Sequence, residues 1–198
     1  MKIQKGLSFY HVHSGLNASK DEVALASSPP TFLKIILGGY SKRKSLLSRR
    51  INWDRVLFIS EDEEVVGYLQ YYLRGKGPHA PSYKDMVEEY GALGALWRFP
   101  VYYLLEKRFK RSEAYLYRVV IKDSFRSRGL GKILIEKWLY LMDEQGLDTV
   151  ELEVWGRNFK AKKLYLSLGF EVVSVFSLPY QGRVFQNGKL IRMARKHY

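Results

Sequence analysis

The sequence contains no cysteine in its 198 residues. Without a thiol, the chain can form neither a disulfide bond nor a cysteine-ligated zinc site, and it has no thiol nucleophile. Histidine is scarce as well, and among the four histidines only His11 and His13 lie close together. Cysteine-based catalysis is therefore excluded, and we expect no metal site.

Long hydrophobic runs are also missing. The longest apolar stretches, 32–39 and 91–105, are too short for a membrane span or are interrupted by Arg98 and Pro100. The start of the chain lacks the apolar core of a secretory signal. We therefore expect a cytoplasmic protein without a membrane partner.

Acidic residues are few relative to basic ones. The chain has 20 Asp and Glu against 33 Lys and Arg, which gives a formal net charge of +13. Such a charge favours a polyanionic partner, which could be nucleic acid, an anionic membrane surface or a phosphorylated cofactor. The basic residues are scattered in short groups, so solvated basic faces explain them equally well. Charge alone does not choose among these alternatives.

The abundant residues indicate one folded domain. Apolar residues make up 46% of the chain and aromatic residues 15%, which excludes a disordered protein. The length fits a single domain, residues 1–198, with one helical insertion at about 74–113. In this insertion a connector rich in Gly and Pro precedes a helical pattern over 83–109, which we expect to be broken near Pro100.

Helical and strand-like patterns flank the insertion. Residues 20–50 are expected to form two helices with a break at 27–30, and 55–60 and 65–73 are expected to form a hairpin. After the insertion we expect strand, helix, strand, helix, strand and strand, at 114–121, 130–144, 149–154, 159–168, 170–178 and 189–195. This order predicts an α/β (α+β) fold, in which a mixed central sheet is flanked by helices.

The strand ending at Ile121 is followed by a short basic loop and a helix, an arrangement that can bind a phosphate. The first amides of a helix have no partner within the helix, and Gly129 and Gly131 allow the backbone to approach an anion closely. The loop does not fit a Walker motif, because Ile133 stands where Ser or Thr is required. A dinucleotide fingerprint would need a third glycine at Leu134. A tight turn with surface arginines is the structural alternative.

Two motifs follow one another in this half of the chain. In the first, Arg126, Gly129 and Gly131 match the pattern Gln/Arg-x-x-Gly-x-Gly/Ala between a strand and a helix. In the second, the pattern Asn-x-x-Ala-x-x-Leu-Tyr-x-x-x-Gly-Phe is matched by Asn158, Ala161, Leu164, Tyr165, Gly169 and Phe170. Both motifs resemble those of the GNAT superfamily of acyl-CoA N-acyltransferases. The run from 152 to 165 is similar to the ribosomal-protein and N-terminal alanine N-acetyltransferases. The resemblance implies the GNAT fold, whose central strands splay apart.

The resemblance also implies where acetyl-CoA binds. In the family, one central strand pairs through its backbone with the pantetheine arm, and the following loop amides hold the pyrophosphate. The slot between the central strands would lie between 118–121 and 151–154. The implied cofactor-binding residues are Val119, Val120, Ile121, Arg126, Ser127, Arg128, Gly129, Leu130, Gly131, Lys132, Asn158 and Tyr165.

Acetyl transfer to an amine needs a base, because an alkylamine is mostly protonated at neutral pH, and it needs a proton donor for the departing thiolate. The resemblance implies Tyr165 as the donor and Glu153 as the base. The structural alternatives are that Tyr165 is an ordinary core aromatic and that Glu153 is a salt-bridged strand residue, with deprotonation through water. Glu151 rivals Glu153 because both lie on the same face of the strand.

We therefore expect an N-acetyltransferase that transfers an acetyl group from acetyl-CoA to a primary amine by direct attack in a ternary complex. The acceptor would be a protein or peptide N-terminus, a lysine or a small-molecule amine. The alternatives are a basic nucleic-acid-binding protein, which the two motifs argue against, and an acyl-CoA-binding pseudoenzyme. The insertion would pack on its own sheet, form the interface of a homodimer, or line the acceptor site through aromatics such as Tyr102 and Tyr103.

Overall fold

The computed structural model describes residues 6–13, 17–177 and 188–196, and it is built around a seven-stranded sheet. The strands are β1 (Leu7–Tyr10), β2 (Val56–Glu61), β3 (Glu64–Leu73), β4 (Ala114–Ile121), β5 (Thr149–Trp155), β6 (Glu171–Ser177) and β7 (Lys189–Lys196). Their spatial order is β1-β2-β3-β4-β5-β7-β6. Neighbouring strands are antiparallel except for β4 and β5, which are parallel, so the sheet is mixed as predicted.

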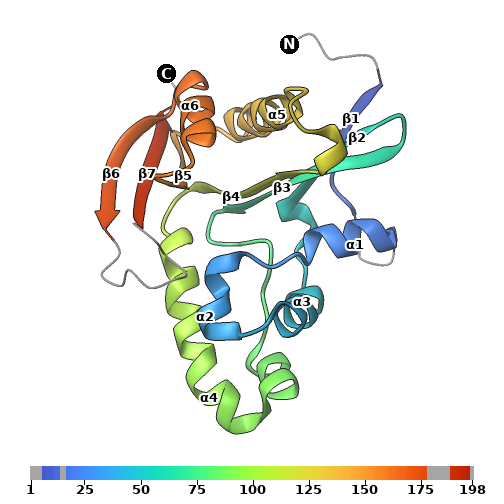
Figure 1. The fold of residues 1–198 in the computed structure, drawn as a ribbon, viewed down its shortest axis with the longest axis vertical. Helices are drawn as coiled ribbons and strands as arrows, with labels where there is room; N and C mark the ends of the chain where they lie inside the picture. The colour runs from blue at the N-terminus through green and yellow to red at the C-terminus, as the bar shows by residue number, and fades with distance from the viewer. Residues whose placement is uncertain (1–5, 14–16, 178–187, 197–198) are drawn as a thin grey trace.

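Helices cover both faces of this sheet (Figure 1). On one face lie α5 (Leu130–Glu144) and α6 (Phe159–Ser167), above the sheet in the figure. On the other face lie α1 (Lys20–Ala26), α2 (Lys34–Leu37), α3 (Tyr40–Ser48) and α4 (Tyr83–Phe109). Of these, α2, α3 and α4 form a lobe that extends away from the sheet. The predicted arrangement of a mixed sheet flanked by helices is confirmed.

The largest core lies between α5 and the sheet. Leu134, Trp138 and Met142 are buried there, and their spacing of four residues places them on one face of the helix. A second core joins α2, α3 and α4 within the lobe. A small aromatic cluster attaches the end of α4 to the sheet through Tyr72, Phe109 and Tyr115. The lobe is therefore fixed to the sheet where α4 ends.

Two helix breaks differ from the prediction. Within 20–50 a further break separates α2 from α3, because Gly38 has a φ of 73°. In α4 the non-helical residue is Gly91, with a φ of 71°, and not Pro100. Glycine adopts a positive φ at little cost, so it is the natural break point. Pro100 is accommodated on the exposed side of the helix, where water can hydrate the carbonyl of Leu96 that loses its donor.

The segment 74–113 leaves and re-enters the sheet at one place. Leu73, the last residue of β3, pairs with Ala114, the first residue of β4. The whole segment therefore replaces the turn between two antiparallel neighbours. This placement is compatible with an insertion into a single domain, which stays a prediction.

The remaining elements agree closely with the expected ones. The hairpin is formed by β2 and β3, and its turn residues Asp62 and Glu63 both have positive φ. The order after the insertion is confirmed, although Leu178 at the end of the predicted strand 170–178 lies outside the described residues. The four-residue edge strand β1, which pairs with β2, is not predicted from the sequence.

Candidate active site

The central strands β4 and β5 separate part-way along their length. Leu116 with Leu152 is the last parallel pair, although β4 continues to Ile121 and β5 to Trp155. At the same point Tyr117 is an extra residue on β4, because Gln70 and Tyr71 of β3 pair with the residues on either side of it. Such a bulge bends a strand away from its neighbour. A slot therefore opens beyond residues 116 and 152, and the predicted splay is present.

The slot begins later on β5 than the sequence predicts. Glu151 pairs with Tyr115 in the closed part of the sheet, whereas Glu153 is the first acidic residue beyond the separation. The predicted lower bound at residue 151 is therefore wrong by two residues. The reason is that the bulge at Tyr117, which sets the point of separation, has no sequence signal of its own.

The loop between β4 and α5 presents the start of a helix to the end of the slot. Ser127 and Gly129 have φ values of 64° and 79°, and Gly129 is the N-cap of the 15-residue helix α5. A Cβ added to Gly131 would lie 3.8 Å from the Ile121 side chain, which is an ordinary contact. Position 131 thus has room for a Cβ, and of these two glycines only Gly129 is required by its backbone conformation.

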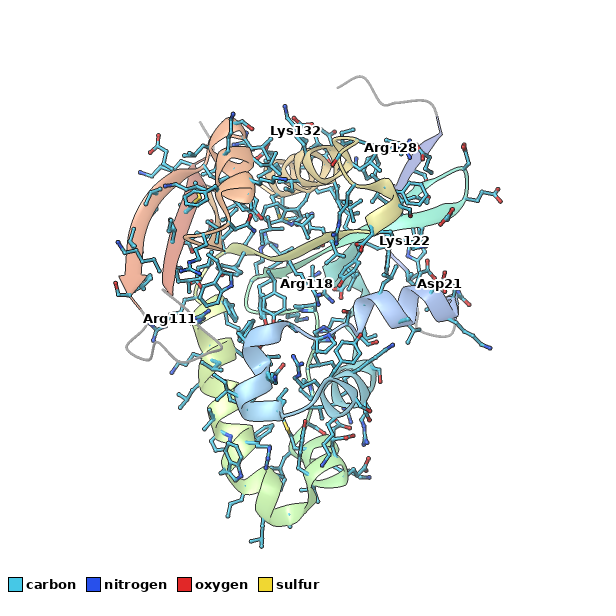
Figure 2. The ribbon with its side chains drawn as sticks, in the orientation of Figure 1. Asp21, Arg111, Arg118, Lys122, Arg128 and Lys132 are labelled. Carbon is cyan, nitrogen blue, oxygen red and sulfur yellow. The ribbon has the colours of Figure 1, made fainter. Side chains whose placement is uncertain are left out.

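The basic side chains of the loop form ion pairs at the surface. Arg126 lies 2.7 Å from Asp123, Arg128 lies 2.7 Å from Glu61, and Lys132 lies 3.8 Å from Glu136. Figure 2 shows Arg128 and Lys132 on the α5 side of the sheet and Arg118 on the opposite side. An anion at the start of α5 would compete with these carboxylates for the basic groups.

The motif residues of α6 have structural contacts. The Asn158 side chain caps the helix by accepting a hydrogen bond from the Ala161 amide over 3.1 Å. Tyr165 is partly buried against the main core, with its ring 5.9 Å from that of Phe170. Burial raises the pKa of the Tyr165 hydroxyl to about 12, so the group keeps its proton at neutral pH. Both residues thus have structural roles besides those that the motif implies.

Glu153 lies beside the slot on the face of the sheet opposite α6. Its carboxylate accepts a hydrogen bond from the Arg108 side chain of α4 over 2.8 Å, and its side chain is 8% exposed. Burial, followed by the charge of the Glu153 carboxylate, raises the pKa of Tyr115 well above its usual range. Arg192 of β7 is paired with Glu153 across the sheet, and its charge also acts on this carboxylate. The predicted base is thus surrounded by Arg108, Tyr115 and Arg192.

Glu151 points to the same face but has other partners. It accepts two hydrogen bonds from Arg192, over 2.9 and 2.8 Å, and one from the Ser112 hydroxyl. Burial raises the pKa of Glu151, but the hydrogen bonds from Arg192 and Ser112 outweigh it and hold this pKa below its usual range. An ionised carboxylate with three hydrogen bonds in the closed part of the sheet has mainly a structural role.

A cavity of about 440 Å³ adjoins the slot on the Glu153 face. Its walls come from the α2 region, from the last turns of α4, and from β4, β5 and β7. Among the described residues that line it, Arg108 and Glu153 are the charged ones, and the others are apolar or aromatic. A ligand in this cavity would reach the slot from the side opposite the loop and α6.

The predicted catalytic residues thus lie on opposite faces of the sheet. The neighbours of Glu153 on β5, Leu152 and Val154, point into the main core against which Tyr165 packs, while Glu153 itself faces the cavity. The slot between β4 and β5 passes between these two faces. This arrangement allows one substrate to enter from each side.

The aromatics that we expected to contact an acceptor do not line the cavity. Tyr102 is 5% exposed within the lobe, and Tyr103 is 54% exposed beside Lys110. Val101 and Leu105 of the same helix line the cavity instead. The exact rotation of α4 decides which residues face the sheet, and apolar residues on nearly all sides of this helix hide that rotation in the sequence.

A buried carboxylate lies behind the wall of the cavity. Glu106 of α4 is 2% exposed and accepts a hydrogen bond from the Tyr72 hydroxyl. Burial raises the pKa of Glu106 to about 7, and the hydrogen bond from Tyr72 and the charges of Lys110 and Arg108 oppose this rise. The charge of Glu106 in turn acts on Tyr117, whose pKa is raised well above its usual range chiefly by burial.

Within residues 6–13, 17–177 and 188–196, no cluster of His, Asp and Glu could hold a metal ion. Over the same residues, no helix is long and apolar enough to cross a membrane.

Comparison with known proteins identifies the class to which this fold and site belong. Residues 29–170 match the model of the acetyltransferase (GNAT) family. Because this match covers more than half of the chain, the protein belongs to that family. The family predicted from the two motifs is confirmed.

Relatives within the family include enzymes that acetylate ribosomal proteins. The chain is 36% identical over 63 residues to the ribosomal protein bS18-alanine N-acetyltransferase of Salmonella typhimurium, a match that spans 32% of this chain and 43% of that enzyme. The crystal structure of the corresponding Escherichia coli enzyme superimposes with a TM-score of 0.56 at 15% identity, over 96% of this chain and 93% of that one. The crystal structure of a GNAT family acetyltransferase from Elizabethkingia anophelis with acetyl-CoA bound superimposes with a TM-score of 0.56 at 10% identity, over 98% of this chain and 100% of that one. These structural likenesses show the fold.

Proposed function

We propose that the protein is an acetyl-CoA-dependent N-acetyltransferase that acts on a primary amine in a ternary complex. The observation that carries this proposal is the separation of β4 from β5 beside the start of α5. Membership of the GNAT family and relatives that are N-acetyltransferases support it. A location in the cytoplasm and a homodimer stay predictions.

The residues around the slot fit acetyl-CoA. The edge of β4 beyond Leu116 is not paired with β5, so those backbone groups of Val119, Val120 and Ile121 that point away from β3 can pair with an extended chain such as pantetheine. The amides at the start of α5 can hold a pyrophosphate. The predicted residues of this loop and helix start are Arg126, Ser127, Arg128, Gly129, Leu130, Gly131 and Lys132. Asn158 and Tyr165 of α6 complete the predicted set.

The protein's own residues would move the protons of the reaction. Bound acetyl-CoA supplies an acetyl group activated as a thioester. Glu153, directly or through a water, takes the proton that the amine loses as its nitrogen bonds to the acetyl carbon. Tyr165, which is protonated at neutral pH, donates its proton to the sulfur as the carbon–sulfur bond breaks. Two positioned substrates account for much of the acceleration, because they react as if at high effective concentration.

The surroundings of the two glutamates favour Glu153 as the base. Glu153 lies at the slot and lines the cavity, whereas Glu151 is held by Arg192 and Ser112 in the paired part of the sheet. The amine would enter through the cavity and meet the thioester in the slot. A Glu153 that serves only as the ion-pair partner of Arg108 is the structural alternative.

Titration calorimetry of the protein with acetyl-CoA, followed by an assay of free coenzyme A with a panel of amines, tests the proposal. We expect one acetyl-CoA to bind per chain and to raise the melting temperature, because a ligand of the folded state stabilises it. The absence of binding at millimolar acetyl-CoA would refute the proposal. Binding without turnover on any amine would identify an acyl-CoA-binding pseudoenzyme.

A further inference from the structure

The cavity beside Glu153 has the walls of a site for an apolar group. Phe32, Leu105 and Phe109 line it from the lobe, and Tyr117, Trp155 and Leu190 line it from the sheet. Its volume of about 440 Å³ lies in the range of sites for small organic ligands. Polar groups buried against such walls lose their hydrogen bonds to water without finding partners.

The charges of the cavity are concentrated at one point. Glu153 is the carboxylate among the described lining residues, and Arg108 lies 2.8 Å from it. An amine beside Glu153 would share this one carboxylate with Arg108. A second cationic group on the same acceptor would have no carboxylate of its own among those lining residues, and it would add to the repulsion from Arg108.

The apolar surface continues outside the cavity. Val101, which lines the cavity and is 38% exposed, belongs to a row of exposed residues on α4. This row consists of Leu93, Trp97, Val101 and Leu104, which are four, four and three residues apart, together with Leu96 beside Trp97, and this spacing places them on one side of the helix. An acceptor larger than the cavity would therefore remain on apolar surface.

On the basis of the proposed acetyltransferase function, we propose that the acceptor is a primary amine carried on a large, uncharged apolar body, with the amine at Glu153 and the body in the cavity. Two sources share this chemistry, a free arylalkylamine and a peptide whose first side chain is large and apolar. Polyamines and aminoglycosides carry several cations or hydroxyls, which do not match the apolar walls of this cavity and the single carboxylate among its described lining residues.

Acetylation of a matched amine panel by the full chain tests this proposal. We expect kcat/KM for 2-phenylethylamine to exceed that for ethanolamine and for putrescine by at least about tenfold, because an apolar pocket discriminates by that factor for a single methylene group. The peptides Phe-Ala-Ala-amide and Ser-Ala-Ala-amide form the second arm, with the same expected preference. The faster of the two apolar acceptors identifies the source.

Two variants of α4 connect this preference to the cavity. Val101→Asn places an amide in the wall and should lower kcat/KM for 2-phenylethylamine at least about fivefold, and by a larger factor than it lowers kcat/KM for ethanolamine. Tyr103→Asn is the matched control, because Tyr103 is exposed on the same helix but does not line the cavity. Equal effects of both variants on 2-phenylethylamine would overturn the assignment.

A binding measurement with 2-phenylethylamine separates this inference from the proposed function, with saturation-transfer NMR as the method of detection. Binding that Val101→Asn weakens and Tyr103→Asn does not would support the cavity assignment even if no amine were acetylated. Acetyl-CoA turnover in which ethanolamine or putrescine matches 2-phenylethylamine would overturn the acceptor class and leave the acetyltransferase function intact. No detectable binding at millimolar 2-phenylethylamine would also overturn it.

Discussion

Arg108 of α4 donates a hydrogen bond to Glu153 of β5, with 2.8 Å between Nη2 and Oε2. This ion pair joins the segment 74–113 to the wall of the slot. Because Val101 and Leu105 of the same helix line the cavity, the segment supplies both an apolar wall and the charged partner of the proposed base. A role of this segment in acceptor binding therefore has more support than packing alone.

Glu153→Gln should lower kcat by about a hundredfold or more, because general bases contribute on the order of 10² to 10⁴ to the rate. The measurement is steady-state release of coenzyme A between pH 5 and pH 9.

Glu151→Gln is the control for this substitution. It removes a charge from the hydrogen bonds with Arg192 and Ser112, so we expect a lower melting temperature and a much smaller loss of kcat than in Glu153→Gln. A larger loss of kcat in Glu151→Gln than in Glu153→Gln would transfer the role of base to Glu151. An unchanged kcat in both variants would point to deprotonation through water without either carboxylate.

Tyr165→Phe should lower kcat far more than it weakens acetyl-CoA binding. The hydroxyl is needed mainly when the thiolate leaves, so its loss should raise the barrier by about 3 kcal/mol, a factor of about a hundred in rate. The ring and its contact with Phe170 remain, so the fold should persist. Calorimetry and single-turnover kinetics measure the two effects separately, and unchanged single-turnover rates would exclude Tyr165 as the donor.

Gly131→Val tests the predicted phosphate loop without straining the protein. Position 131 has room for a Cβ, so the melting temperature should change little, while the side chain should obstruct a pyrophosphate and raise the Kd for acetyl-CoA about tenfold or more. Gly129→Val is the contrast, because its φ of 79° makes any side chain unfavourable and both stability and binding should fall. An unaltered Kd in Gly131→Val would place the phosphates elsewhere.

The sequence predicts the fold best where its signals are local. The hairpin and the elements from Ala114 onward follow from β-branched runs, amphipathic periodicity and glycines with positive φ such as Gly146 and Gly169. The break in α4 is misplaced, because proline costs a helix less on its exposed side than sequence rules suppose. The edge strand β1 is too short to show a period.

The candidate site is predictable only in part, because only some of its features have local signals in the sequence. Glu153 and Tyr165 belong to motifs within one stretch of chain, so a family resemblance finds them. The contact between Arg108 and Glu153 joins residues 45 positions apart, and neither periodicity nor motif spacing connects them. The bulge at Tyr117 lies where β4 and β5 separate, with Glu151 before this point and Glu153 beyond it, and it arises from the register of β3 against β4. Such features follow from packing and are seen only in the folded chain.

Glu106→Gln should reveal the buried carboxylate through the pH dependence of stability. Glu106 releases its proton near pH 7 in the folded protein, against about 4.5 when it is exposed, so the folded state binds more protons between these values. The free energy of unfolding therefore falls as the pH rises through this window, by about 3 kcal/mol in total for such a shift. Glutamine has nearly the same size and stays neutral, so the variant should gain stability relative to the wild type over the same window.

Urea denaturation of both proteins at pH 4, 5, 6, 7 and 8 measures this difference. His79, whose pKa burial lowers to about 4, acts in the opposite direction, because the unfolded state takes up its proton first as the pH falls. That contribution is common to both proteins and cancels in their difference. We therefore expect the difference in unfolding free energy to move in favour of Glu106→Gln between pH 4 and pH 8. A difference that is constant across this range would mean that Glu106 has the same pKa in the folded and unfolded states, because Tyr72, Arg108 and Lys110 then fully offset the effect of burial.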